Sequence, residues 1–137
     1  MSGEPPKRIA AAVLQRPDGA VLLLKRAPTH TTNPGKWCFV TGYVNQGEDP
    51  RDAAIRELHE ELGLEAEPIR AGEIVVVHTS WATLHVYPFL FRVDVETVEI
   101  DWEHTAYDWI KPEELYDYDF VQQLDDDLIA LGLLPAR

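Results

Sequence analysis

The sequence predicts a single α/β domain in which a mixed β-sheet lies between α-helices. The length of 137 residues fits one domain, which normally takes roughly 100–200 residues. A hydrophobic content of 45% is enough for a packed core and argues against a disordered chain. Strand-like runs also alternate with helical segments along the whole sequence. We therefore expect one domain over residues 1–137, with residues 1–6 as a flexible tail.

Strands dominate the part of the chain that precedes the first helix. The expected strands are residues 7–15, 20–24 and 37–44. The first two flank the sequence RPDG, which is typical of a tight turn, so we expect them to form a hairpin. The third is expected to break at Gly42. Residues 25–36 are rich in proline and threonine, which indicates an irregular connection.

Residues 50–62 carry the strongest helix signals. Asp49 is a favourable N-cap, and Pro50 suits the first helical position because its missing N–H would have no partner there. Gly63 provides a C-terminal stop. The apolar positions that recur every three or four residues are Ile55, Leu58 and Leu62. This spacing predicts one helix face suited to burial.

The second half of the chain is also expected to mix strands and helices. The expected elements are strands over 71–79, 83–95 and 104–110, a short helical turn over 112–115 and a closing helix over 120–131. Pro88 lacks a backbone donor, so it favours a sheet edge or a bulge for the strand that contains it. The closing helix is predicted because its apolar residues again recur at helical spacing.

Charge and composition exclude several classes of partner. The chain has 24 Asp and Glu against 12 Lys and Arg, a formal net charge of −12. Such a surface repels phosphate, so neither a nucleic-acid polymer nor an anionic membrane is expected as a partner. One Cys and one Met exclude a disulfide framework and a cysteine-built zinc site. With no apolar run long enough to cross a bilayer, and with Cys38 unpaired, we expect a cytoplasmic location.

The predicted helix carries a group of acidic side chains. Glu57, Glu60 and Glu61 stand at positions i, i+3 and i+4, which brings them to one side of a helix. Crowded carboxylates repel one another, and either Arg56 or a divalent cation can compensate them. Oxygen ligands of this kind suit Mg²⁺ or Mn²⁺, which also bind substrate phosphates. By itself, the pattern is more often a solvated helix face in an acidic protein.

The surrounding residues favour the metal-binding interpretation. From Gly42 to Leu64 the sequence is GYVNQGEDPRDAAIRELHEELGL. It resembles the Nudix hydrolase signature, G-x5-E-x7-R-E-U-x-E-E-x-G-U with U aliphatic, at every specified position. The similarity extends to residues 24–26, 35–37 and 103–109. One departure is Thr41, where many relatives have glycine.

The resemblance implies the Nudix fold and hydrolysis of a nucleoside diphosphate linked to another moiety, X. An anionic nucleophile is repelled by pyrophosphate, so metal ions are needed to neutralise charge and acidify a water, and a carboxylate then takes the remaining proton. Mg²⁺ or Mn²⁺ is the implied cofactor. Residues 103–109 resemble those of nucleoside triphosphate and dihydroneopterin triphosphate pyrophosphatases, which favours a nucleoside triphosphate-like substrate.

The resemblance also implies roles for individual residues. Glu60, Glu61 and the carbonyl of Gly42 are expected as metal ligands. Glu57 is expected either as a ligand or as the general base, and the choice stays open. Glu103 is a candidate for an additional ligand or base, with an exposed loop acid as the alternative.

Basic residues and loops complete the predicted site. Arg56 is expected to orient the carboxylates by ion pairing, with Glu48 in support. Arg26 and Lys36 are candidate phosphate contacts, although solvated charges at strand ends would give the same pattern. Substrate specificity is expected to come from the loops at 25–36 and 80–83. Trp81, Tyr87 and Tyr43 are candidate stacking residues, although such aromatic residues are more often buried structure.

Three alternatives remain open at this stage. Within the same class, a dinucleoside polyphosphate is the alternative substrate. A Nudix-fold nucleotide sensor without turnover is a different class, although an intact set of Glu57, Glu60 and Glu61 favours an enzyme. An acidic interaction protein would have no tight Mg²⁺ or Mn²⁺ site. The expected partner is a small nucleotide, and a homodimer is a candidate assembly because homodimers are common among similar proteins.

Overall fold

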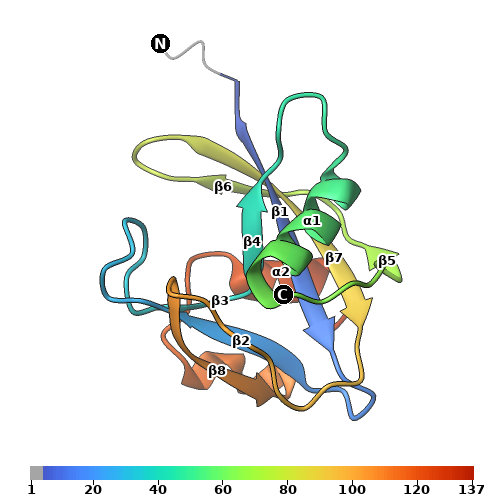
Figure 1. Ribbon diagram of the computed structural model, residues 1–137. Coiled ribbons are helices and arrows are strands. Elements are labelled where there is room, and N and C mark those ends of the chain that lie inside the picture. The colour runs from blue at the N-terminus through green and yellow to red at the C-terminus, as the bar shows by residue number, and fades with distance from the viewer. Residues whose placement is uncertain (1–4) are drawn as a thin grey trace.

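The computed structural model describes residues 5–137, so the first four residues of the expected tail lie outside the described residues. The strands are β1 (Lys7–Gln15), β2 (Val21–Arg26), β3 (Trp37–Cys38), β4 (Val40–Tyr43), β5 (Arg70–Ala71), β6 (Val75–His78), β7 (Thr83–Arg92) and β8 (His104–Ile110) (Figure 1). The helices are α1 (Pro50–Leu62), the 3₁₀ helix η1 (Pro112–Asp117) and α2 (Leu124–Ala130). Within the described range, none of them has the length and apolar character of a membrane span.

β1 lies at the centre of a mixed sheet. It runs parallel to β7 from the pair Lys7 and Leu84 to the pair Gln15 and Arg92, and it runs antiparallel to β4. Its expected hairpin partner β2 meets it only where Gln15 faces Val21. Beyond that pair, β2 turns away and joins β3 and β8 (Figure 1). The predicted hairpin is therefore correct at its turn, but its strands diverge into two halves of the sheet.

The helix predicted over residues 50–62 is confirmed at both ends. The Asp49 side chain accepts a hydrogen bond from the backbone N–H of Arg51 at 2.8 Å. Gly63 has a φ of 68°, a left-handed conformation that glycine adopts readily, and its N–H donates to the carbonyl of His59. The buried residues of α1 are Ala53, Ala54, Leu58 and Leu62. The helix end that carries the glutamates is thus fixed against the sheet.

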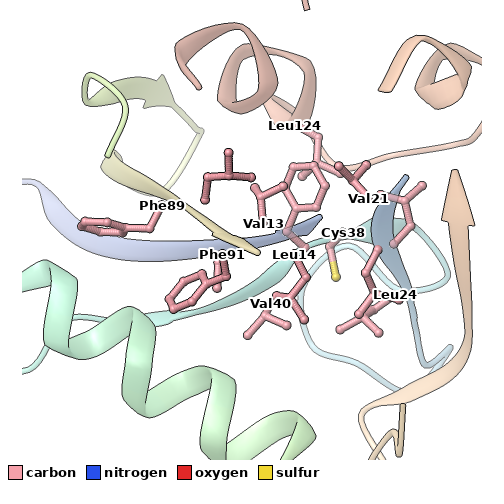
Figure 2. Packing of buried hydrophobic residues seen from close by; sticks show 14 of the residues in the cluster. Val13, Leu14, Val21, Leu24, Cys38, Val40, Phe89, Phe91 and Leu124 are labelled. Atoms are coloured by element: carbon pink, nitrogen blue, oxygen red, sulfur yellow. The ribbon is translucent and has the colours of Figure 1, made fainter. Parts of the chain in front are cut away.

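The core fills the space on both faces of the sheet. Figure 2 shows Val40 and Phe91 on the side that faces α1, and Leu124 on the opposite side, toward α2. The two phenylalanines at 39 and 91 and the leucines at 124 and 128 are essentially inaccessible to solvent. The α/β architecture with helices on both faces, predicted from the sequence, is confirmed.

The strand expected over 37–44 is interrupted at Phe39 rather than at Gly42. β3 pairs with β2, whereas β4 crosses to the other half of the sheet and pairs with β1. The break therefore marks a change of partner strand, which no local property of the residues announces.

The strand expected over 71–79 is divided into β5 and β6. The two short strands pair with different parts of β7, and the gap lies near Pro88. Proline has no N–H for the sheet, and Gly72 instead donates to the Pro88 carbonyl at 2.9 Å. Of the two expected placements, an edge or a bulge, the edge is wrong, because Pro88 lies in a strand that is paired on both sides. The strand itself ends at Arg92 rather than at residue 95.

The closing helix begins at Leu124, later than the expected residue 120. The residues before it extend the sheet edge, because Trp37 N donates to the carbonyl of Asp119 at 2.9 Å and Val121 N donates to the carbonyl of Trp37 at 3.0 Å. Gln123 then takes a left-handed φ of 77° to redirect the chain into α2. A long-range pairing with β3 thus overrides the helical periodicity of residues 120–123.

Candidate active site

A cleft of about 540 Å³ gathers residues that are far apart in the sequence. Residues of β1, β4 and β7 line it, and the glutamates of α1 face it. The β2–β3 loop, the turn between β6 and β7, and the segments before β8 and α2 also contribute lining residues. Of the predicted site, the cleft contains Arg26, Gly42, Glu57, Glu60, Glu61 and Glu103. Its size suits a small-molecule ligand.

Gly42 is explained by the packing of β4 against α1. A Cβ atom added to Gly42 would lie 2.0 Å from Cδ of Glu57 and 2.2 Å from its Oε1. Non-bonded carbon atoms normally approach no closer than about 3.5 Å, so any larger residue at position 42 would displace this carboxyl group. The residue that opens the motif therefore allows the Glu57 side chain to rest directly on the strand.

The Arg56 guanidinium connects the motif loop to α1. Its Nε and Nη2 donate to the two carboxylate oxygens of Glu48 at 2.9 and 3.0 Å, and Nη2 also donates to the Tyr43 carbonyl at 3.0 Å. Its Nη1 donates to Glu57 at 2.7 Å and to Glu60 at 3.2 Å. The hydrogen bonds from Arg56 lower the pKa of Glu48 to about 2. Arg56 does not line the cleft, and its side chain bonds three carboxylates and the Tyr43 carbonyl.

Glu61 is the helix carboxylate that this guanidinium does not reach. Its side chain is 12% exposed, and its Oε2 atom is buried with no hydrogen-bond partner among the described residues. Burial and the neighbouring charge of Glu57 raise the pKa of Glu61 to about 9, and burial raises the pKa of Glu57 as well. Burial disfavours the charged form unless positive charge is supplied. The site is therefore short of positive charge at Glu61.

The same features fit a divalent cation. An orphaned carboxylate oxygen and neighbouring acids offer the hard oxygen ligands that Mg²⁺ and Mn²⁺ prefer. Within residues 5–137, no three Asp, Glu, His or Cys side chains already converge closely enough to enclose an ion. This open arrangement suits Mg²⁺, which usually keeps several waters and takes further ligands from substrate phosphates.

Glu103 enters the cleft from the segment that precedes β8. Its carbonyl accepts a hydrogen bond from Ala27 N at 2.8 Å, which joins this segment to the β2–β3 loop. Its carboxylate oxygen Oε2 lies 3.5 Å from Nε2 of His30. Carboxylates of α1 and of the β8 segment thus line one cavity, and the role of Glu103 as a ligand or base stays a prediction.

Sequence reasoning missed three residues that line this cleft: His30, Asp101 and His104. His104 is buried, and its Nδ1 lies 3.0 Å from Oδ1 of Asp101. The spacing of the histidines along the sequence shows no ligand pattern. The β2–β8 pairing brings the segments that carry His30 and His104 to the same cleft. The only available signal was the position of His104 directly after Glu103. His59, by contrast, is exposed and lies outside the cleft.

The two predicted phosphate contacts differ in position. Arg26 lines the cleft and holds the β2–β3 loop, since it donates to the Thr32 carbonyl at 2.9 Å and lies 2.9 Å from Nδ1 of His30. Lys36 is not among the cleft residues, and its Nζ donates to Asp119 at 3.4 Å in an exposed pair. The geometry therefore keeps Arg26 as a candidate and assigns Lys36 to the alternative, a solvated charge.

A second hollow of about 500 Å³ adjoins the cleft and shares Asn33, Trp81 and Gln123 with it. Its lining residues in the described chain include hydroxyl, amide and apolar side chains and the imidazole of His78, but no Asp, Glu, Lys or Arg. Trp81 is 52% exposed at the turn between β6 and β7. Both loops expected to control specificity contribute to this hollow. A surface without carboxylate, ammonium or guanidinium groups and with an exposed indole suits a flat heterocycle.

The sheet, the motif helix and the acidic cleft together define a Nudix hydrolase. The NUDIX domain family model matches residues 5–131, and the chain belongs to this family. The resemblance predicted from the residues of the motif is thereby confirmed.

The chain is similar along most of its length to two bacterial proteins and to a solved structure. The chain is 36% identical to CTP pyrophosphohydrolase of Escherichia coli strain K12, over 80% of this chain and 79% of that protein. It is 31% identical to the nucleoside triphosphatase NudI of Escherichia coli O17:K52:H18, over 93% of this chain and 99% of that protein. Among solved structures, the MutT protein from Methanosarcina mazei Go1 shares the fold with a TM-score of 0.81, at 24% identity and over 96% of both chains.

Proposed function

We propose that this Nudix hydrolase cleaves a pyrophosphate bond in a small nucleotide with the help of a divalent metal ion, and that its substrate is a nucleoside triphosphate-like compound. The observation that carries the proposal is the buried, unpartnered oxygen of Glu61 beside Glu57 in an acidic cleft. A pyrophosphate would add negative charge beside the Glu61 carboxylate, which already lacks a compensating cation. Divalent cations bound between the carboxylates and the phosphates would neutralise this repulsion.

The metal, Mg²⁺ or Mn²⁺, would be held by the groups that face the acidic end of the cleft: the Gly42 carbonyl and the carboxylates of Glu57, Glu60, Glu61 and Glu103. When bound, such an ion neutralises phosphate charge and makes a coordinated water more acidic. The donor set is entirely oxygen, which matches the preference of Mg²⁺. The identity of the ion and the number of ions are parts of the proposal.

The remaining steps belong to side chains of the protein. Arg56 holds Glu57 and Glu60 in fixed directions through its hydrogen bonds. A carboxylate that faces the cleft accepts the proton of the attacking water. Glu57 and Glu103 are the two candidates for this base, and Arg26 is the cation that can meet a phosphate directly. Replacement of each glutamate by Gln, with pH–rate profiles of both variants, assigns the base.

The substrate class is inferred from the uncharged hollow and from the relatives. The hollow around Trp81 suits a nucleobase, which puts the phosphates toward the glutamates. The two relatives named above are a CTP pyrophosphohydrolase and a nucleoside triphosphatase, which points to the same class. A homodimer and a cytoplasmic location remain predictions from the sequence.

The direct test is a substrate panel with and without Mg²⁺. Nucleoside triphosphates, dihydroneopterin triphosphate, dinucleoside polyphosphates and ADP-sugars are assayed for release of phosphate or pyrophosphate. We expect metal-dependent turnover that is fastest for a triphosphate. Preference for a dinucleoside polyphosphate would replace the proposed substrate, and nucleotide binding without turnover would identify a sensor.

A pair of neighbouring variants tests the site itself. Glu60→Gln is expected to lower kcat by about 10²–10⁴-fold, the range for loss of a positioned carboxylate or its metal. His59→Ala is the matched control, because His59 is exposed on the same helix but does not line the cleft. Near-normal turnover by a folded Glu60→Gln protein would contradict the proposed site.

A further inference from the structure

The buried side chain of His104 links two carboxylates on different elements. His104 begins β8, and its side chain is 3% exposed. On one side, its Nδ1 lies 3.0 Å from Oδ1 of Asp101. On the other side, its Nε2 lies 3.8 Å from Oε1 of Glu61, which belongs to α1. The imidazole therefore stands between the β8 segment and the motif helix.

Asp101 also shapes the turn that carries Glu103. Its Oδ1 accepts a hydrogen bond from the backbone N–H of Glu103 at 3.0 Å, and its carbonyl accepts one from His104 N at 3.2 Å. A substitution of Asp101 or His104 would therefore alter the positions of both Glu103 and Glu61. Arg56 forms no hydrogen bond with either Glu103 or Glu61.

We propose that Asp101 and His104 are positioning residues that aim the Glu61 carboxylate, and the turn bearing Glu103, at a common metal ion. This inference rests on the proposed function, because it requires Glu61 to serve a bound cation. His104 itself touches neither metal nor substrate in this role. It acts through Glu61.

Each ring nitrogen of His104 faces a different carboxylate. A carboxylate accepts hydrogen bonds, so the Asp101 contact places a proton on Nδ1 and fixes the plane of the ring. Nε2 is then directed at Glu61. The distance of 3.8 Å is longer than a hydrogen bond, so the proposed role requires the two groups to approach each other. In that bond Nε2 must be the donor, because an ionised Glu61 carboxylate can only accept.

An imidazole is well suited to this position because it can bond at both ends while buried. Glu61 has one oxygen without a partner in the described chain, and the other faces His104. If His104 holds the second oxygen, the first stays free to face a cation. With a side chain that lacks Nε2, the Glu61 carboxylate could rotate, and neither of its oxygens would be held toward the cation.

The test compares two amides that each replace one half of the imidazole. His104→Gln can reach the position of Nε2, whereas His104→Asn reaches only that of Nδ1. Mn²⁺ affinity of the nucleotide-free protein is measured by electron paramagnetic resonance, together with kcat, KM and Tm. His59→Asn is the control, because His59 is an exposed histidine on α1 outside the cleft.

We expect His104→Asn to weaken Mn²⁺ binding by about 10–100-fold, the range for loss of a group that orients a metal ligand. We expect kcat to fall by a similar factor with little change in KM, and His104→Gln to recover most of both losses. Wild-type Mn²⁺ affinity and kcat in a folded His104→Asn protein would overturn the inference, as would equal losses in both variants. Should His104→Asn fail to fold, Asp101→Asn is measured in its place, with the same loss of Mn²⁺ affinity expected and unchanged affinity counting against the inference.

The outcomes separate this inference from the proposed function. A wild-type protein that neither binds Mn²⁺ nor hydrolyses any nucleotide of the panel refutes the proposed function, and the role of His104 with it. A wild-type protein that does both, beside variants of His104 that bind Mn²⁺ equally well, refutes only the positioning role.

Discussion

Substitution of Gly42 by Ala tests whether the close contact between β4 and Glu57 is essential to the site. The added Cβ would lie 2.0 Å from Cδ of Glu57, whereas an ordinary contact is about 3.5–4.0 Å. The carboxyl group must therefore move by about 1.5 Å or more. Mg²⁺ demands oxygen ligands at about 2.0–2.1 Å, and a misplacement of about 1 Å can cost roughly 10²-fold in rate. We expect kcat/KM to fall by about 10²-fold or more.

The assay measures kcat/KM with the best substrate of the panel, beside Mn²⁺ affinity and thermal unfolding. Overpacking of this kind costs about 1–3 kcal/mol of stability, so a loss of activity must be separated from a loss of fold. Gly19→Ala is the matched control, since its φ of 92° makes alanine costly by about 1–2 kcal/mol in a turn outside the cleft. Activity and metal affinity of Gly42→Ala equal to those of Gly19→Ala would refute the reasoning.

Two further predictions concern stability and substrate binding. Burial raises the pKa of the Asp127 carboxyl well above its ordinary value, so the folded state holds this proton more tightly than the unfolded chain. Its contribution to stability is therefore lost as pH rises above the ordinary pKa of 3.8, by up to about 1.4 kcal/mol per pH unit. Asp127→Asn should gain stability relative to wild type between pH 4.5 and 7.5 in urea unfolding, and a constant difference would contradict this. Trp81→Ala should raise KM by about 5–150-fold with a smaller change in kcat, since base stacking is worth about 1–3 kcal/mol; an unchanged KM for every triphosphate would remove Trp81 from the nucleobase site.

Local signals in the sequence were sufficient for the motif helix and the central strand. The cap at Asp49, the stop at Gly63 and the spacing of the apolar residues act within a few positions, and the helix has the predicted bounds. β1 likewise has the predicted bounds. The i, i+3 and i+4 spacing also put Glu57, Glu60 and Glu61 in one cleft, because helical geometry alone relates them.

The structure departs from the prediction where the bounds of a helix or strand depend on pairing with residues that are distant in the sequence. Residues 120 and 121 belong to the predicted helix but pair with Trp37, and that pairing delays α2. The gap between β5 and β6 depends on Pro88, a residue of another strand. Backbone groups at these positions gain sheet hydrogen bonds that no local pattern encodes.

The sequence by itself determined the family and the helix that presents the acids. These depend on residue identity and on spacing along one element. Only the tertiary structure decided that Glu57 rests on Gly42, that Arg26 faces the cleft while Lys36 does not, and that His104 lies between Asp101 and Glu61. The physical reason is that such contacts join elements whose relative position is set by the packing of the whole core, and not by the preferences of any one segment.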